Sequence, residues 1–149
     1  MQIEEEIQQT NFKNPLHKAV LNVKFTANWL SGISLPIFKK YGISEEQFNV
    51  LRILKGQYPT PSSLQLITER MLNRMSNVTR LVEKLRVNGY VTREICPENR
   101  RRVNILITKK GLNLLEQVSP EIDLVLNQDN QLTDTEIKTL NQLLDKIRQ

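Results

Sequence analysis

Arginine, serine, threonine and asparagine side chains gather between residues 70 and 110, and their functional groups are those that bind nucleic acids. This stretch holds eleven Lys and Arg residues against three Glu, a local net charge of +8 in a chain whose total is +5. The rest of the chain is therefore acidic. Because cations release the counterions of DNA phosphates, such a confined basic field predicts a nucleic-acid-binding face. A solvated charged surface is the alternative.

A helix beginning near residue 75 would carry the reading groups. Val78, Leu81, Val82 and Leu85 recur at the spacing of one buried helical stripe. Gly89 follows at a position typical of a helix end. Short polar and basic side chains occupy the other faces and the approach to the helix, where they can bond phosphates and base edges: Arg74, Ser76, Asn77, Thr79, Arg80 and Lys84.

A second, shorter helix is predicted just upstream. Pro59 and Pro61 prevent the preceding helix from continuing, and Ser62 or Ser63 then supplies an N-cap. A short turn at Leu72 and Asn73 would connect the two helices, which makes a helix-turn-helix. We include Ser62 and Ser63 among the predicted DNA-binding residues.

A β-hairpin is predicted after these helices. Val103, Ile105 and Ile107 alternate as in a half-buried strand, and the opposing strand lies near Tyr90 to Ile95. The polar tip between them, residues 96–102, ends in Arg100, Arg101 and Arg102, which have no core role. A narrow cationic hairpin can enter a minor groove or follow a phosphate backbone. Since neighbouring strand residues project to opposite sides, we expect Arg101 in the minor groove and the other two at phosphates or in solvent.

These segments together resemble the MarR (multiple antibiotic resistance regulator) family of bacterial transcription factors. The resemblance rests on Ser76–Leu85, Gly89–Val91, Pro97–Arg101 and Ile107–Gly111, and a capping box of Ser44 and Gln47 opens a helix where the family has one. The family's wing motif is Asp-x-Arg, whereas this chain has Asn99-Arg100-Arg101. Arg101 therefore corresponds to the wing-tip arginine, and Asn99 replaces the aspartate.

The resemblance implies a fold that is mainly α-helical with a small β-hairpin wing. One domain would span residues 1–149, with a winged helix-turn-helix core at about 44–111 and dimerisation helices at about 12–40 and 109–148. Apolar stripes agree with this, and the second C-terminal helix would open at the box Thr133-x-x-Glu136 after a linker at Asn127 to Gln131. The apolar stripe of the first helix consists of Leu16, Ala19, Val20, Val23, Ala27 and Leu30. The alternative is that these helices only wrap the core.

Composition argues against other classes of protein. One Cys and one His leave no multi-ligand His/Cys metal cluster, no disulfide framework and little material for a Cys-His or Ser-His catalytic device. None of the five Gly forms a phosphate-cradling pattern. We therefore expect no catalytic residues, no cofactor and no metal. The acidic N-terminus and the lack of a long apolar run predict a cytoplasmic protein without membrane contact. Cys96 is expected to be inert rather than a redox sensor, and His17 a surface or interface residue rather than a ligand.

The predicted function is a homodimeric, sequence-specific transcriptional regulator, a repressor in preference to an activator. Its partners would be a palindromic stretch of double-stranded DNA and a second copy of the chain, with a small-molecule effector left open because no ligand-binding residues can be identified. An architectural winged-helix protein with little sequence preference is one alternative, and a protein-interaction module with an incidental basic face is another. An enzyme is the most remote.

Overall fold

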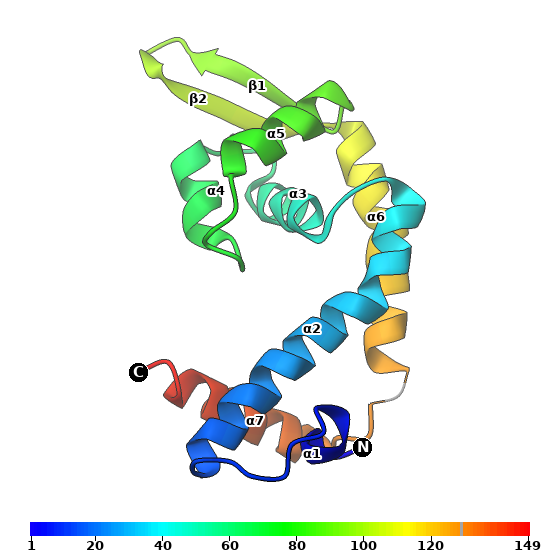
Figure 1. Cartoon of the computed structure of the whole chain (residues 1–149). Helices are drawn as coiled ribbons and strands as arrows, with labels where there is room; N and C mark the ends of the chain where they lie inside the picture. Colours follow the sequence, from blue (N-terminus) through cyan, green and yellow to red (C-terminus); the bar gives the residue numbers. More distant parts are fainter. Residues whose placement is uncertain (129) are drawn as a thin grey trace.

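The computed structural model of the chain describes residues 1–128 and 130–149, and it is mainly helical with one antiparallel hairpin, as predicted. Asp129, within the predicted linker 127–131, lies outside the described residues. Figure 1 shows the hairpin and the helices between residues 45 and 87 gathered at one end of the molecule. The elements in order are α1 (Ile3–Glu6), α2 (Pro15–Tyr41), α3 (Glu45–Gln57), α4 (Leu64–Arg70), α5 (Val78–Val87), β1 (Val91–Cys96), β2 (Asn99–Ile107), α6 (Lys109–Asn127) and α7 (Asp134–Lys146).

Two long helices, α2 and α6, connect the two ends of the molecule (Figure 1). The Asn14 side chain caps α2 by accepting a hydrogen bond from the His17 backbone N–H at 2.8 Å. Near the other end of α2, Lys40 and Tyr41 each donate to Oε1 of Glu121 on α6, both at 2.6 Å. These bonds lower the pKa of the Glu121 carboxyl, with Lys40 making the larger contribution. They fasten α6 to the end of α2 nearest to α3, α4, α5 and the β1–β2 hairpin, which we call the winged module.

The core of the winged module confirms the predicted apolar stripe. Val78, Val82 and Leu85 of α5 are buried, and Leu81 is half-buried against the same core. The capping box that opens α3 is also confirmed, since Ser44 Oγ accepts from the Gln47 N–H at 3.1 Å and Gln47 Oε1 accepts from the Ser44 N–H at 2.8 Å. The α3, β2 and α6 side chains that complete this core include Val50, Leu51, Leu54, Ile105, Ile107, Leu115 and Val118.

The other end of the molecule exposes apolar side chains. Helix α7 opens with the predicted Thr133/Glu136 capping box, yet it has no buried residue. An open groove of about 540 Å³ runs between α7 and the N-terminal half of α2. Its apolar lining is Ala19, Val23, Ala27, Leu30, Leu140, Leu143, Leu144 and Ile147. In the described parts of the chain, no helix is both long and apolar enough to cross a bilayer.

The end of α5 is joined to the start of α6 through three consecutive carbonyl groups. The Asn88 carbonyl accepts from Lys110 Nζ at 2.7 Å, and the Gly89 carbonyl accepts from Thr108 Oγ1 at 2.7 Å. The Tyr90 carbonyl accepts from the Thr108 N–H at 3.0 Å. We call this set, residues 88–90 with residues 108–111, the α5–α6 junction. It fixes where α5 ends relative to α6.

Gly111 allows the two segments of the junction to approach. A Cβ at Gly111 would overlap the Tyr90 carbonyl oxygen and lie 2.7 Å from Cγ1 of Ile107. Gly89 makes the turn from α5 into β1 with a φ of +77°, a backbone conformation that residues with a side chain rarely adopt. Both glycines are therefore required by backbone geometry.

Gly111→Ala should destabilise the protein by about 1–3 kcal/mol, because the new methyl group has no space without backbone movement. Chemical denaturation followed by circular dichroism measures this. Gly56→Ala is the matched control, since Gly56 is also helical but nothing lies within 4 Å of a Cβ there. It should be neutral or stabilise by up to about 1 kcal/mol. Equal effects of the two substitutions would contradict this account of Gly111.

Candidate nucleic-acid interface

Helix α5, the second helix of the predicted helix-turn-helix and its recognition helix, starts later than the sequence predicts. Asn77 Oδ1 accepts from the Arg80 N–H at 3.1 Å, so Asn77 is the N-cap and Val78 the first helical residue. Upstream, Asn73 makes a separate turn, accepting from the Ser76 N–H at its carbonyl and from the Met75 N–H at its side chain. The connection therefore spans residues 71–77 rather than a short turn at residues 72–73. Two asparagine side chains competing for backbone N–H groups explain the difference.

The predicted serines do not all face outward. Ser62 is only 1% exposed, and its backbone N–H and carbonyl pair with Ile105 of β2, both at 2.8 Å. The prediction that Ser62 contacts DNA is therefore wrong, because this bridge adds its segment to the edge of the wing. Ser63 caps α4 by accepting from the Leu66 N–H at 3.1 Å. Ser76 Oγ is covered by protein and lacks a hydrogen-bond partner among the described residues, contrary to its predicted outward position.

The exposed face of α5 keeps the predicted polar and basic groups. Thr79, Arg80 and Lys84 are exposed, as is Asn77, whose side-chain NH₂ remains available while its Oδ1 caps the helix. The acid on this helix, Glu83, is held by Arg86 through two hydrogen bonds, at 3.0 and 2.7 Å. Arg86 accordingly lowers the pKa of the Glu83 carboxyl.

The charges of Arg80 and Lys84 are left uncompensated by this arrangement. Neither forms an ion pair with a side chain in the described residues. Arg74, in the turn before the helix, is exposed and also lacks an ion pair there. A face that combines free cations with short hydrogen-bonding groups can contact both phosphates and base edges.

The wing is longer and less regular than predicted. Its turn is only Pro97 and Glu98, and the three arginines belong to β2. Ile95 pairs with Val103 while Cys96 pairs with Asn99, so residues 100–102 have no partners on β1 and form a bulge. All three arginines are exposed. The bulge interrupts the regular alternation on which the assignment of Arg101 to the minor groove rested, so that assignment stays a prediction.

Asn99 organises the start of this bulge. Its Oδ1 accepts a hydrogen bond from the Arg101 backbone N–H at 3.1 Å. A short side-chain acceptor that bonds the N–H two residues on is a common turn device, and Asn and Asp both supply it. The departure from the family's Asp-x-Arg motif therefore keeps the backbone contact and removes one negative charge.

Sequence reasoning missed two residues near this face. Asn49 of α3 accepts from the Leu72 N–H at 2.9 Å and so fixes the turn before the recognition helix. No local pattern marks it, because its partner is 23 residues away. Arg93 is exposed on β1 and adds a cation beside Glu83. It lay within the basic stretch but outside the predicted tip.

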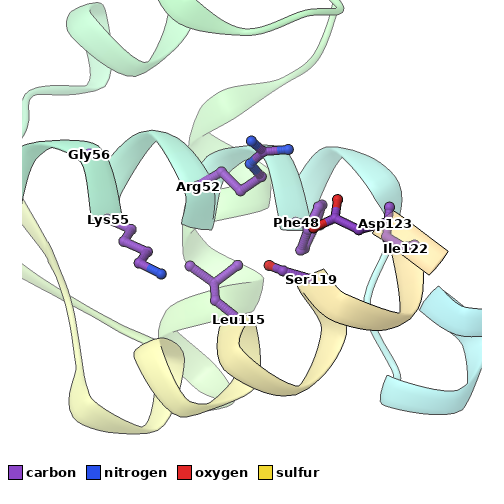
Figure 2. A pocket seen from close by; sticks show the side chains of 8 residues that line it. All are labelled: Phe48, Arg52, Lys55, Gly56, Leu115, Ser119, Ile122 and Asp123. Carbon is purple, nitrogen blue, oxygen red and sulfur yellow. The ribbon is translucent and has the colours of Figure 1, made fainter. Parts of the chain in front are cut away.

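A cavity of about 420 Å³ lies between α3 and α6 (Figure 2). Phe48, Leu115 and Ile122 form its apolar wall, and Arg52 and Lys55 of α3 add two cations. Ser119 and Asp123 of α6 line it as well (Figure 2). Within residues 1–128 and 130–149, no group of three His, Cys, Asp or Glu side chains could hold a metal ion.

The sequence and the fold are similar to those of known transcriptional regulators. The sequence profile of the MarR family matches residues 43–103. The HTH-type transcriptional regulator MgrA of Staphylococcus aureus is 30% identical over 139 residues, which cover 93% of this chain and 91% of MgrA. The uncharacterized HTH-type transcriptional regulator YkoM of Bacillus subtilis is 35% identical over 82 residues, 55% of this chain, and the match spans about half of YkoM, 52% of its length.

Solved structures show the same fold. A MarR-like transcription regulator from Bacillus cereus superposes with a TM-score of 0.75 at 26% identity, covering 85% of this chain and 91% of that one. Sco3205 of Streptomyces coelicolor, a MarR family transcriptional regulator solved in complex with DNA, gives 0.77 at 20% identity, with 94% and 90% covered. BpsR of Bordetella bronchiseptica, whose DNA binding is regulated by 6-hydroxynicotinic acid, gives 0.78 at 20% identity, with 93% and 96% covered.

Substitutions at Asn99 should separate the effect of its hydrogen-bond acceptor from that of the negative charge that an aspartate would add. Asn99→Ala should weaken DNA binding about threefold, since one exposed hydrogen bond that orders the wing is lost. Asn99→Asp should stay within about twofold of the parent, because the acceptor remains and an exposed charge contributes little. Titrations of labelled duplex over a salt series measure both. If Asn99→Asp weakened binding as much as Asn99→Ala, the acceptor would not be what matters.

Proposed function

The chain belongs to the MarR family of DNA-binding transcriptional regulators, and we propose that it is a homodimeric repressor that recognises a palindromic operator. One observation carries the proposal. The uncompensated cations of α5 lie on the same small module as the exposed arginine bulge of the wing, so one chain offers a base-reading helix and a flanking cationic arm. These match the two elements by which winged helices bind duplex DNA.

Two parts of one domain divide the work in this proposal. Residues 44–111 read DNA, and the helices at about 12–40 and 109–148 hold a second copy of the chain. The open groove between α2 and α7 supports this division, since Leu143 is 59% and Leu30 38% exposed in the single chain. An isolated protein rarely leaves so continuous an apolar surface in water. A two-fold dimer would bury it and match the symmetry of a palindrome.

Individual side chains take distinct roles. Asn77, Thr79 and Arg80, at the N-terminal end of α5, read base edges in the major groove. Ser63, Arg74 and Lys84 lie beside them and contact phosphates, and Ser76 joins them only by reorienting its covered hydroxyl. The wing supplies minor-groove and phosphate contacts through Arg100, Arg101 and Arg102.

Two other functions make different demands on the same surface. An architectural protein that coats or bridges DNA would bind unrelated duplexes with similar affinity. An interaction module with an incidental basic face would show little salt-dependent DNA binding. The exposed hydrogen-bonding groups of Asn77 and Thr79 favour sequence reading over both, because they can bond base edges as well as phosphates.

Selection of genomic fragments by the purified protein tests the proposal. The recovered sites should share an inverted repeat whose half-sites lie about one helical turn apart, roughly 34–36 Å. Sedimentation of the complex should give a pair of protomers on each site. Recovery of fragments without a shared sequence would favour the architectural function, and a monomer on one half-site would exclude the dimer.

The variant Arg80→Ala then tests the recognition helix on the selected operator. It should lose about 1–3 kcal/mol of specific binding and relax the preference at one base pair of each half-site. Glu6→Gln, which removes an exposed charge from α1 outside both the DNA-reading part and the dimerisation helices, is the control and should bind as the parent does. Parental binding by Arg80→Ala would contradict the assignment of α5 as the reading helix.

A small-molecule effector that releases the operator is a further part of the proposal. The cavity between α3 and α6 supports it, because Arg52 and Lys55 beside the Phe48 ring suit an anionic ring compound (Figure 2). BpsR, with the same fold, is regulated by such a compound. An aromatic carboxylate should release operator from the parent but not from Arg52→Ala, as measured by fluorescence anisotropy. Equal release from both proteins would remove Arg52 from the effector site.

A further inference from the structure

Lys110 belongs to the basic segment of the sequence, but its ammonium group faces the protein. Nζ donates to the Asn88 carbonyl at 2.7 Å and lies 4.9 Å from the centre of the Tyr90 ring. Its neighbour Lys109 is exposed as Lys110 is, but the Lys109 ammonium group has no hydrogen bond or ion pair in the described residues. Two adjacent lysines therefore differ in role, and only one of them is built into the α5–α6 junction.

The place where Lys110 binds is electrostatically suited to a cation. The Asn88 carbonyl directly follows the C-terminus of α5, where the helix dipole is negative. The Tyr90 ring presents a second attractive surface to the ammonium group. Lys110 thus holds the last carbonyl of the recognition helix from a position in the first turn of α6.

Helix α6 in turn leads to the proposed dimer interface. It runs along α2, fastened by Lys40 and Tyr41 to Glu121, and its far end precedes α7 (Figure 1). The junction is therefore a direct hydrogen-bonded link between the helix that would read DNA and the helix that leads to the partner copy. A change in the angle between α5 and α6 would move the two recognition helices of a dimer apart or together.

We propose that Lys110 is a positioning residue: by holding the end of α5 on α6 it sets the separation of the two recognition helices, and with it the half-site spacing that the dimer accepts. This inference rests on the proposed palindrome-binding function. It assigns Lys110 no contact with DNA. The consequence is a loss of spacing discrimination, without loss of a phosphate contact, when the ammonium group is removed.

The experiment compares full-length parent, Lys110→Met, Lys110→Arg and the neighbouring control Lys109→Met on operators whose half-site spacing is varied by single base pairs. Lys110→Met should weaken binding at the best spacing about fivefold and flatten the preference among spacings. Its salt slope should equal that of the parent, since no phosphate contact is lost. Lys110→Arg, which keeps a cationic donor, should restore the preference, and Lys109→Met should leave the spacing preference intact.

Other outcomes decide the matter differently. If Lys110→Met lowers the salt slope by about one and weakens all spacings equally, Lys110 is a phosphate contact and the proposal is wrong. Parental behaviour of Lys110→Met also overturns it. If thermal melts show that Lys110→Met is unfolded, Lys110→Gln, whose amide still donates, is judged by the same two criteria. Absence of any spacing preference in the parent would count against the proposed function itself, not against Lys110 alone.

Discussion

The geometry of the DNA-binding module depends on one hydroxyl group, that of Thr108. It donates to the Gly89 carbonyl at the end of the recognition helix and accepts from the Gly111 N–H at 3.1 Å, which caps α6. The same group thus closes one helix and opens the next. The Thr108 backbone N–H also donates to the Tyr90 carbonyl. Tyr90 directly precedes β1 and Thr108 directly follows β2, so this bond joins the two ends of the hairpin at the same point.

This constraint explains why helix and wing can act as one unit. The hairpin leaves α5 at Gly89 and returns to α6 at Thr108, so both its ends are fixed at the junction. Its base is buried through Val91 and Ile107, while the rest of β1 and the bulge with its arginines are largely exposed. Displacement of α6 would therefore move the recognition helix and the wing together, which is the kind of rigid-body change that a two-state regulator needs.

Features set by neighbours in sequence could be predicted, and features set by distant partners could not. The stripe of Val78, Val82 and Leu85 and the capping box of Ser44 and Gln47 involve residues within seven positions, and both are confirmed. Ser62 was misassigned because its partner, Ile105, lies on the far strand of the wing. The late start of α5 was missed although its cause is local. The side chains of Asn73 and Asn77 accept hydrogen bonds from nearby backbone N–H groups, and the hydrophobic pattern alone predicts a longer helix because it does not include these bonds.

Charge shows the same limit, because a count of basic residues does not say which of them reach DNA. Of the eleven cations in the basic stretch, Arg86 is bonded to Glu83 and Lys110 to the Asn88 carbonyl, whereas Arg80, Lys84 and the wing arginines form no ion pair in the described residues. The salt dependence of binding reports phosphates neutralised, at a slope of about 0.9 for each. It should therefore be shallower than the composition suggests, since part of the positive charge of this segment holds the module in shape rather than holding DNA.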